Sequence, residues 1–348
     1  MRLPSPISRL LVQFQPWLLP IAAFAGFVEL VGGGWDIQWH LARIPEVFWT
    51  PPHIVLYSGA SVVIATTGAA FLLPWAGVAL PRSFRLATSL AFAGALLQVV
   101  AGGFDQWWHA TYGADDALSP PHVLLTGAIL LAALGILLSL HAMRRQEEAA
   151  GRTRAVSWIA QSVAATGVGW ALWGLLFVTL SPGFNADDKL LDPFGWSLFV
   201  GGAFAMTTPI LVFLAGRLVR HRGAATLAAG VQVVGTLTIA GLMGGLDPLV
   251  LALSPIFLVP GVLVDLFYKP ARGNAPYVAI VLGAIIGQFS FLTGGIVDAM
   301  TLPASQPVAF ALAYVGGGVA ATLLALALGD AADGMAARDR GARPATAS

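Results

Sequence analysis

The chain has no cysteine among its 348 residues, which excludes disulfides, thiolate metal sites and cysteine nucleophiles. Charged residues are also scarce, at 10%, whereas hydrophobic residues make up 57% and the mean hydropathy is +0.80. No ordinary soluble domain has this composition. The net charge of +1 comes without an exposed basic domain, so we expect no nucleic-acid partner. These values indicate a protein whose main partner is the lipid bilayer.

Long apolar stretches fill most of the chain. A bilayer core needs about 20 apolar residues per helix, and the sequence predicts an all-α, polytopic integral membrane protein with about ten transmembrane helices. The eighth stretch starts directly after the seventh, at Asp247-Pro248. The ten stretches are residues 14–34, 53–76, 85–104, 121–142, 156–180, 194–216, 224–245, 248–267, 275–297 and 306–329.

The basic residues predict the orientation of these helices. With the N-terminus in the cytoplasm, sixteen of the eighteen lysines and arginines fall on the cytoplasmic side, leaving Arg43 and Lys189 outside. The positive-inside rule expects this asymmetry of short loops. We therefore expect a multi-pass protein of a bacterial-type inner membrane, with the N- and C-termini cytoplasmic.

One unusual segment occurs twice. Residues 33–53 and 102–122 align without a gap at an offset of 69, and eight of their 21 positions are identical. Both copies contain the pattern Asp-x3-His-x12-His, and together they hold four of the six histidines. The identical pairs are Gly33/Gly102, Gly34/Gly103, Asp36/Asp105, Trp39/Trp108, His40/His109, Pro51/Pro120, Pro52/Pro121 and His53/His122. Because six of these residues can ligate a metal ion, the repeat is where function is to be sought.

The repeat also organises the chain. Residues 1–142 are predicted to form two helical hairpins whose loops face the outside. Residues 143–329 follow as a six-helix membrane region that begins with a charged connection at 143–155, and residues 330–348 are predicted to be a disordered cytoplasmic tail.

Helical spacing places the ligands of each copy together. If the first helix continues past Gly34, Asp36 and His40 are four residues apart on one face, with Glu29 two turns deeper. A proline pair suits a helix start, so His53 stands at the beginning of the next helix and brings a second imidazole. The corresponding residues of the second copy are Asp105, His109, His122 and, in place of the glutamate, Gln98.

One carboxylate and two imidazoles per hairpin form a set that suits copper, iron(II) or zinc and leaves coordination positions open. Two other interpretations remain: a purely structural Asp–His hydrogen bond, and haem ligation, in which the carboxylate has no obvious part. The neighbouring tryptophans are expected to belong to an interfacial belt. They are Trp35, Trp39, Trp49, Trp107 and Trp108.

The doubled pattern resembles the copper-binding region of the C subunit of particulate methane monooxygenase and ammonia monooxygenase. The resemblance covers roughly residues 20–140 and does not extend to the six C-terminal helices. It implies one copper site at Asp36, His40 and His53 and another at Asp105, His109 and His122, with iron or zinc as less favoured metals. In that family the second site usually has Asn at the position of Asp105.

This resemblance implies a copper-dependent membrane monooxygenase, or a subunit of one, that oxidises a small apolar or amine substrate. Homo-oligomerisation or association with other subunits of that kind follows as an expectation. Catalytic residues are not assigned. Glu29 and Gln98 are expected to pair with each other outside the ligand set and to relay protons.

Two other functions remain open. The chain could be a transporter or metal-uptake permease, in which Glu29 and Gln98 line the path and Asp265 and Gln288 continue it. The repeat speaks against this, because it is parallel whereas many carriers have inverted repeats. The third hypothesis is a copper-delivery or assembly protein.

Overall fold

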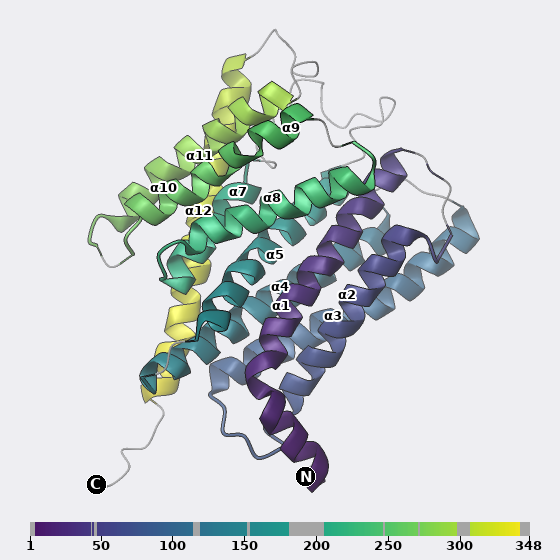
Figure 1. Cartoon of the computed structure of the whole chain (residues 1–348), viewed down its shortest axis with the longest axis vertical. Helices are drawn as coiled ribbons and strands as arrows, with labels where there is room; N and C mark the ends of the chain where they lie inside the picture. The colour runs from purple at the N-terminus through teal and green to yellow at the C-terminus, as the bar shows by residue number, and fades with distance from the viewer. Residues whose placement is uncertain are drawn as a thin grey trace.

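The computed structural model describes residues 4–42, 44, 47–113, 119–151, 154–180, 205–245, 248–270, 272–297 and 307–341. Over these residues the chain consists of helices and contains no strand (Figure 1). The helices are α1 (Ser5–Leu41), α2 (Pro51–Leu72), α3 (Arg82–Tyr112), α4 (Pro120–Ala149), α5 (Ala155–Leu180), α7 (Thr207–Leu214), the π-helix η2 (Ala215–Val219), α8 (Ala224–Leu242), α9 (Pro248–Leu253), the 3-10 helix η3 (Ser254–Leu258), α10 (Val259–Phe267), α11 (Ala275–Val297) and α12 (Pro307–Gly341).

The predicted all-α polytopic membrane fold is confirmed. In the described part of the chain, seven helices are long and apolar enough to cross a bilayer, namely α1 to α5, α8 and α12. Three predicted spans correspond to shorter apolar helices: α7 with η2, η3 with α10, and most of α11. The stretch 248–267 is divided into α9, η3 and α10, because Pro255 and Pro260 lack the N–H that a continuous helix needs. Residues 194–204 and Asp247 lie outside the described residues.

The first four helices form two antiparallel hairpins. Helix α1 packs along α2 and α3 along α4, while α2 also contacts α3, α1 contacts α4, and α5 packs against α1 and α4 (Figure 1). The helices of each hairpin approach closely at glycines: a Cβ on Gly59 would lie 2.5 Å from the backbone nitrogen of Glu29, and one on Gly135 would lie 2.3 Å from that of Ala91. Small residues permit this backbone approach, so each hairpin is a tightly packed unit.

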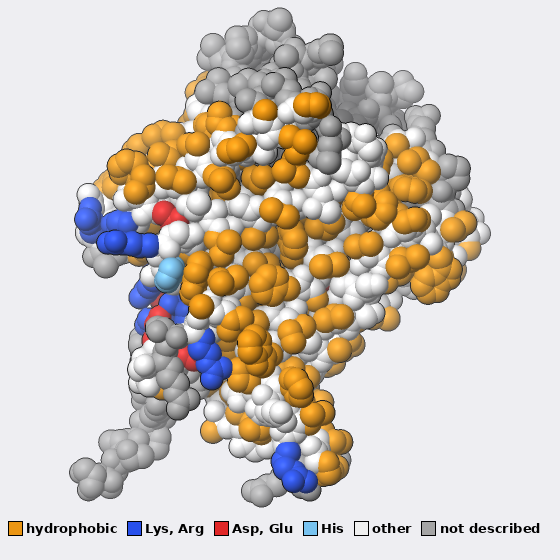
Figure 2. Space-filling view, viewed as in Figure 1, with side chains coloured by type: hydrophobic (Ala, Val, Ile, Leu, Met, Phe, Trp, Pro, Cys, Tyr) orange, Lys and Arg blue, Asp and Glu red, His pale blue; other side chains and the backbone are white. Residues whose placement is uncertain are grey.

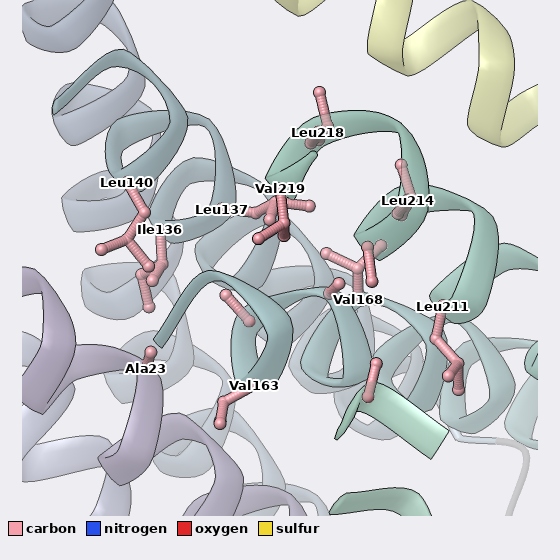
Figure 3. Close-up of a cluster of buried hydrophobic side chains, with 14 of the residues drawn as sticks. Ala23, Ile136, Leu137, Leu140, Val163, Val168, Leu211, Leu214, Leu218 and Val219 are labelled. Atoms are coloured by element: carbon pink, nitrogen blue, oxygen red, sulfur yellow. The ribbon is translucent and has the colours of Figure 1, made fainter. Parts of the chain in front are cut away.

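A hydrophobic core joins the hairpins to the rest of the molecule. Leu137 and Leu140 of α4, Val163 of α5 and Leu218 of η2 belong to one cluster of buried side chains, and all four are at most 2% exposed (Figure 3). Burying a large aliphatic side chain contributes about 1.5–3 kcal/mol relative to leaving it in water. Inside a bilayer the helices do not gain this energy of transfer from water. Close packing of these side chains instead holds α4, α5 and η2 together.

The surface is divided by residue type. The visible face is largely hydrophobic, and its lysine and arginine side chains gather at the lower and left edges (Figure 2). Arg82 begins α3 and Arg144 lies in the last turns of α4, so both stand at the ends of these helices opposite to the loops that join α1 to α2 and α3 to α4. The hairpin loops and these basic residues therefore occupy opposite ends of the hairpin bundle.

Two predicted irregular segments are helical instead. The charged residues 143–148 of the predicted connection extend α4 to Ala149, and the predicted disordered tail continues α12 from Asp330 to Gly341. Both extensions have partners. Glu147 in the extension of α4 accepts a hydrogen bond from the Ser157 hydroxyl of α5 at 2.8 Å. Asp339 in the extension of α12 accepts hydrogen bonds from the backbone N–H groups of Arg82 and Ser83 at the start of α3, at 3.1 and 3.0 Å. Composition alone misled the prediction, because acidic residues that look solvated in sequence cap or pair with another helix. Residues 342–348 lie outside the described part.

Candidate metal centre

The helix boundaries bring the predicted ligands to the same end of the two hairpins. Helix α1 continues past Gly34 to Leu41, and α3 continues to Tyr112, so Asp36 and Asp105 lie near the ends of these helices. The next helix of each hairpin begins at a proline pair, at Pro51 and at Pro120, which are 69 residues apart. Both predicted helix starts are confirmed.

The second set, Asp105, His109 and His122, is assembled. Oδ1 of Asp105 lies 3.3 Å from Nε2 of His122 and 3.5 Å from Nε2 of His109, and one donor atom from each residue lies within 4.8 Å of the others. Two donors bound tetrahedrally at about 2.0–2.1 Å from one ion are about 3.4 Å apart. The Asp105 carboxylate also accepts a side-chain hydrogen bond from His122. The spacing of the three donor atoms is thus compatible with a shared cation as well as with hydrogen bonding.

The start of α4 positions His122. The Ser119 hydroxyl accepts a hydrogen bond from the His122 backbone N–H at 3.4 Å, as an N-cap residue does. The Thr126 hydroxyl donates to the carbonyl oxygen of His122 at 2.8 Å. The His122 side chain is 13% exposed and that of Asp105 is 15% exposed, so the donors are sheltered but remain reachable.

The first set has the same central contact. Oδ1 of Asp36 lies 3.1 Å from Nε2 of His53. The other ring nitrogen of His53, Nδ1, lies 3.3 Å from the carbonyl oxygen of Phe48, and Tyr57 stacks on the imidazole with ring centroids 5.5 Å apart. A hydrogen bond from Nδ1 to a carbonyl leaves Nε2 as the ligand atom. The backbone of His40 lies in α1, one turn after Asp36, and its side chain lies outside the described part.

The two sets lie near each other. Asp105 interacts electrostatically with both histidines of its own set and also with His53 of the first hairpin. The contact of α2 with α3 accounts for this, because His53 begins α2 and Asp105 lies near the end of α3. The described ligands of the two hairpins therefore belong to one region of the molecule.

Aromatic side chains surround the two sets. Trp49 and Trp107 are 67% and 52% exposed, as expected of an interfacial belt. Trp35 and Trp108 differ, because their indole N–H groups are buried and have no hydrogen-bond partner in the described residues. These two indoles are thus partly withdrawn from the surface.

Glu29 and Gln98 lie close together, deeper in the hairpins. Their side chains are 2% and 5% exposed, and the Gln98 amide interacts with the Glu29 carboxyl group. Each lies seven residues before the aspartate of its helix, which is about 10 Å along the axis. They are therefore too deep to bind an ion held by Asp36 or Asp105, as the spacing predicts.

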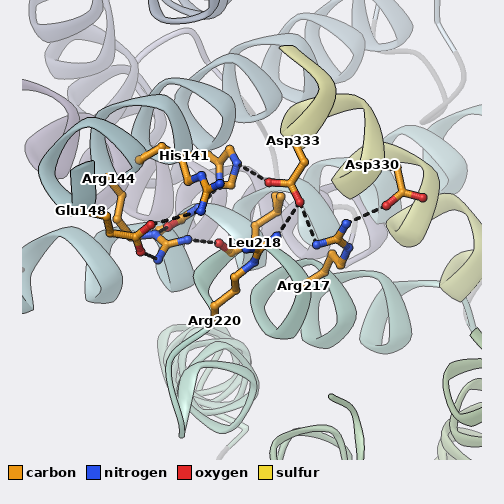
Figure 4. Close-up of polar contacts among 10 residues, drawn as sticks. His141, Arg144, Glu148, Arg217, Leu218, Arg220, Asp330 and Asp333 are labelled. Atoms are coloured by element: carbon orange, nitrogen blue, oxygen red, sulfur yellow. Dashed lines mark hydrogen bonds and ion pairs between the residues drawn. The ribbon is translucent and has the colours of Figure 1, made fainter. Parts of the chain in front are cut away.

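A buried cluster of charged residues at the other end was not predicted. The Asp333 carboxylate of α12 forms ion pairs with Arg217 and Arg220, at 2.8 and 2.6 Å. It also lies 3.3 Å from Nε2 of His141 (Figure 4). Arg144 donates to Gln161 at 2.9 Å and also contacts Glu148 and the carbonyl oxygen of Leu218. The cluster was missed because the residues after 329, which include Asp333, were predicted to be disordered. The arginine–carboxylate pairs give it a structural role.

Comparison with known protein families, with curated proteins and with solved structures yields no match.

Proposed function

We propose that this chain is a membrane copper protein with two Asp/His/His sites at the outer face of the bilayer. One observation carries the proposal: Oδ1 of Asp105 lies 3.3 Å from Nε2 of His122 and 3.5 Å from Nε2 of His109. This set stands at the end of a hairpin whose sequence pattern occurs twice. The cytoplasmic orientation of both termini belongs to this proposal and rests on the basic residues at the opposite end.

The donor chemistry favours copper. Imidazole and carboxylate ligands suit copper, zinc and iron, and copper(II) binds such sites most tightly among the divalent first-row ions. The resemblance to the monooxygenase C subunit supports the same metal. In each set the carboxylate offsets charge on the ion, and the Phe48 carbonyl orients His53 so that Nε2 faces Asp36.

Three protein donors leave positions for water or substrate. Bound copper at such a site supplies redox and dioxygen chemistry. We extend the proposal to oxidation of a small apolar or amine substrate, with the chain acting in a monooxygenase-like assembly. The indoles of Trp35 and Trp108 would limit access of bulk water to the region.

A transport path has less support. Asp265 accepts hydrogen bonds from the backbone N–H groups of Ala225 and Thr226 at 3.3 and 2.8 Å, and Gln288 donates to the Ala311 carbonyl at 3.0 Å. These two polar residues, which a carrier would use in the inner half, therefore connect helices to one another.

Metal analysis of the detergent-purified protein tests the proposal. The protein is purified without chelator, incubated with copper(II), desalted and measured by elemental analysis and electron paramagnetic resonance. We expect about two copper ions per chain, one per set, nitrogen hyperfine structure from imidazole, and loss of about half the copper in His122→Ala.

The matched control is His221→Ala, which removes an imidazole that stacks on Trp158 at 4.2 Å outside both sets. This control should keep its copper. Wild-type protein that binds no copper, or equal loss in both variants, would refute the copper sites. Dioxygen uptake and copper flux in proteoliposomes then distinguish an oxidase from a carrier.

A further inference from the structure

A small cavity lies among the hairpin helices and α5, deeper than the metal ligands. Its volume is about 20 Å³, and its walls are apolar except for one side chain, Glu29 of α1. The wall includes Gly26 and Leu30 of α1, Val63 of α2 and Gly167 of α5.

A polar atom with unused hydrogen-bonding capacity lies at this cavity. Oε1 of Glu29, whose side chain lines the cavity, is buried and has no hydrogen-bond partner among the described residues. Gln98 lies against the Glu29 carboxyl group but is not part of the cavity wall. An unpartnered buried polar group costs about 1–3 kcal/mol, and a buried unpaired charge costs more. A small molecule in the cavity that hydrogen-bonds to Oε1 of Glu29 would remove the cost of leaving this oxygen without a partner.

The volume of the cavity indicates which molecule fits into it. A space of about 10–15 Å³ or more holds one water molecule, provided that polar partners are present. The protonated Glu29 carboxyl group offers an O–H donor and an acceptor oxygen, and water can use both. No positively charged side chain lines the cavity in the described residues, so nothing there would balance an ionised carboxylate.

We propose that this cavity holds one water molecule hydrogen-bonded to Glu29, and that Glu29 is a proton-binding site inside the hairpin bundle. At low pH the carboxyl group carries the proton and is uncharged. At high pH it becomes a carboxylate, and the proton passes by way of the cavity water to bulk solvent. Glu29 is the only titratable side chain of α1, α2, α4 or α5 among the residues lining the cavity, and Gln98 of α3 is neutral. The site lies about 10 Å from Asp36 along α1, and its existence does not depend on metal binding.

Infrared difference spectroscopy of the metal-free protein tests this proposal. Spectra are recorded between two pH values in H2O, D2O and H2(18O). We expect a carboxylic acid C=O band that shifts in D2O and is absent in Glu29→Gln, together with an O–H band of an internal water that shifts in H2(18O).

Filling the cavity supplies a second test that keeps every polar group. A Cβ on Gly26 would have Val63 as its nearest neighbour at 3.8 Å, and one on Gly167 would have Leu30 at 3.6 Å, both ordinary contacts. The double variant Gly26→Ala/Gly167→Ala should lose the water band and raise the frequency of the Glu29 C=O band. Gly127→Ala, whose Cβ would meet nothing within 4 Å, is the matched control and should keep both bands.

Each result decides a part of the proposal. A spectrum with no Glu29-dependent carboxylic acid band overturns the proton site. A carboxylic acid band without an isotope-sensitive water band that responds to cavity filling overturns the water. Because the samples carry no metal, a failure of the copper sites would leave these outcomes unchanged.

Discussion

Nε2 of His53 lies 3.1 Å from Oδ1 of Asp36, and this contact joins the start of α2 to the end of α1. The same contact recurs at 3.3 Å between His122 and Asp105, 69 residues later in both partners. In each hairpin, a carboxylate of the first helix thus contacts an imidazole of the second. The contact across the hairpin, rather than the spacing within one helix, defines the proposed site.

Asp105 tests the importance of ligand charge. Asp105→Asn keeps the size of the side chain and removes its charge, so we expect copper affinity at the second set to fall by at least tenfold, since loss of a partner outside the ligand set already costs about 10–100-fold. Competition titration against a copper chelator measures the change. The control Asp330→Asn, at the opposite end of the bundle, should leave the affinity unchanged. An unaltered affinity in Asp105→Asn would remove Asp105 from the ligand set.

The capping serine makes a prediction about stability. Ser119→Ala removes the hydroxyl that accepts from the His122 N–H, so we expect the protein to lose about 1 kcal/mol of stability and to bind copper less tightly at the second set. Thermal unfolding in detergent and the same titration measure both effects. Thr50 occupies the equivalent position and makes no capping hydrogen bond. Thr50→Ala should therefore cost less, and the reverse order would contradict the capping role.

Gly59 provides a test of hairpin packing. Its missing side chain lets the Glu29 backbone approach, and a Cβ there would lie 2.5 Å from the Glu29 nitrogen. Gly59→Ala should separate α1 from α2 and destabilise the protein by about 1–3 kcal/mol. Gly102→Ala in α3, where a Cβ would meet nothing within 4 Å, is the control for helix propensity. Equal melting temperatures for the two variants would show that the close approach is not required.

The cluster around Asp333 predicts a difference between two neighbouring aspartates. Asp333→Ala leaves Arg217 and Arg220 without their shared carboxylate. We expect a loss of about 2 kcal/mol, less than the roughly 3–5 kcal/mol of a fully buried pair, because the Asp333 side chain is 21% exposed. The Asp330 side chain is 71% exposed and contacts Arg217 alone within the described ion pairs. Asp330→Ala should change stability by less than about 0.5 kcal/mol. Thermal unfolding of both variants, measured side by side in one detergent, checks this order.

The sequence predicted the parts of this molecule that local rules determine. Hydropathy identified the spanning helices, and the Asp–His spacing together with the proline pairs located the helix ends that carry Asp36 and His122. The sequence did not predict the helix after Asp330, because the partners of Asp333 and Asp339 lie more than a hundred residues away in the chain. The Phe48 carbonyl that orients His53 was also missed, since a backbone contact leaves no signature in residue type.

Helix α3 is a rod of 31 residues, about 46 Å long, with a different anchor at each end. Asp339 of α12 holds the backbone amides of Arg82 and Ser83 at the first end, and Asp105 and His109 stand at the other. The C-terminal helix therefore caps the same helix whose opposite end carries a carboxylate and an imidazole of the proposed site.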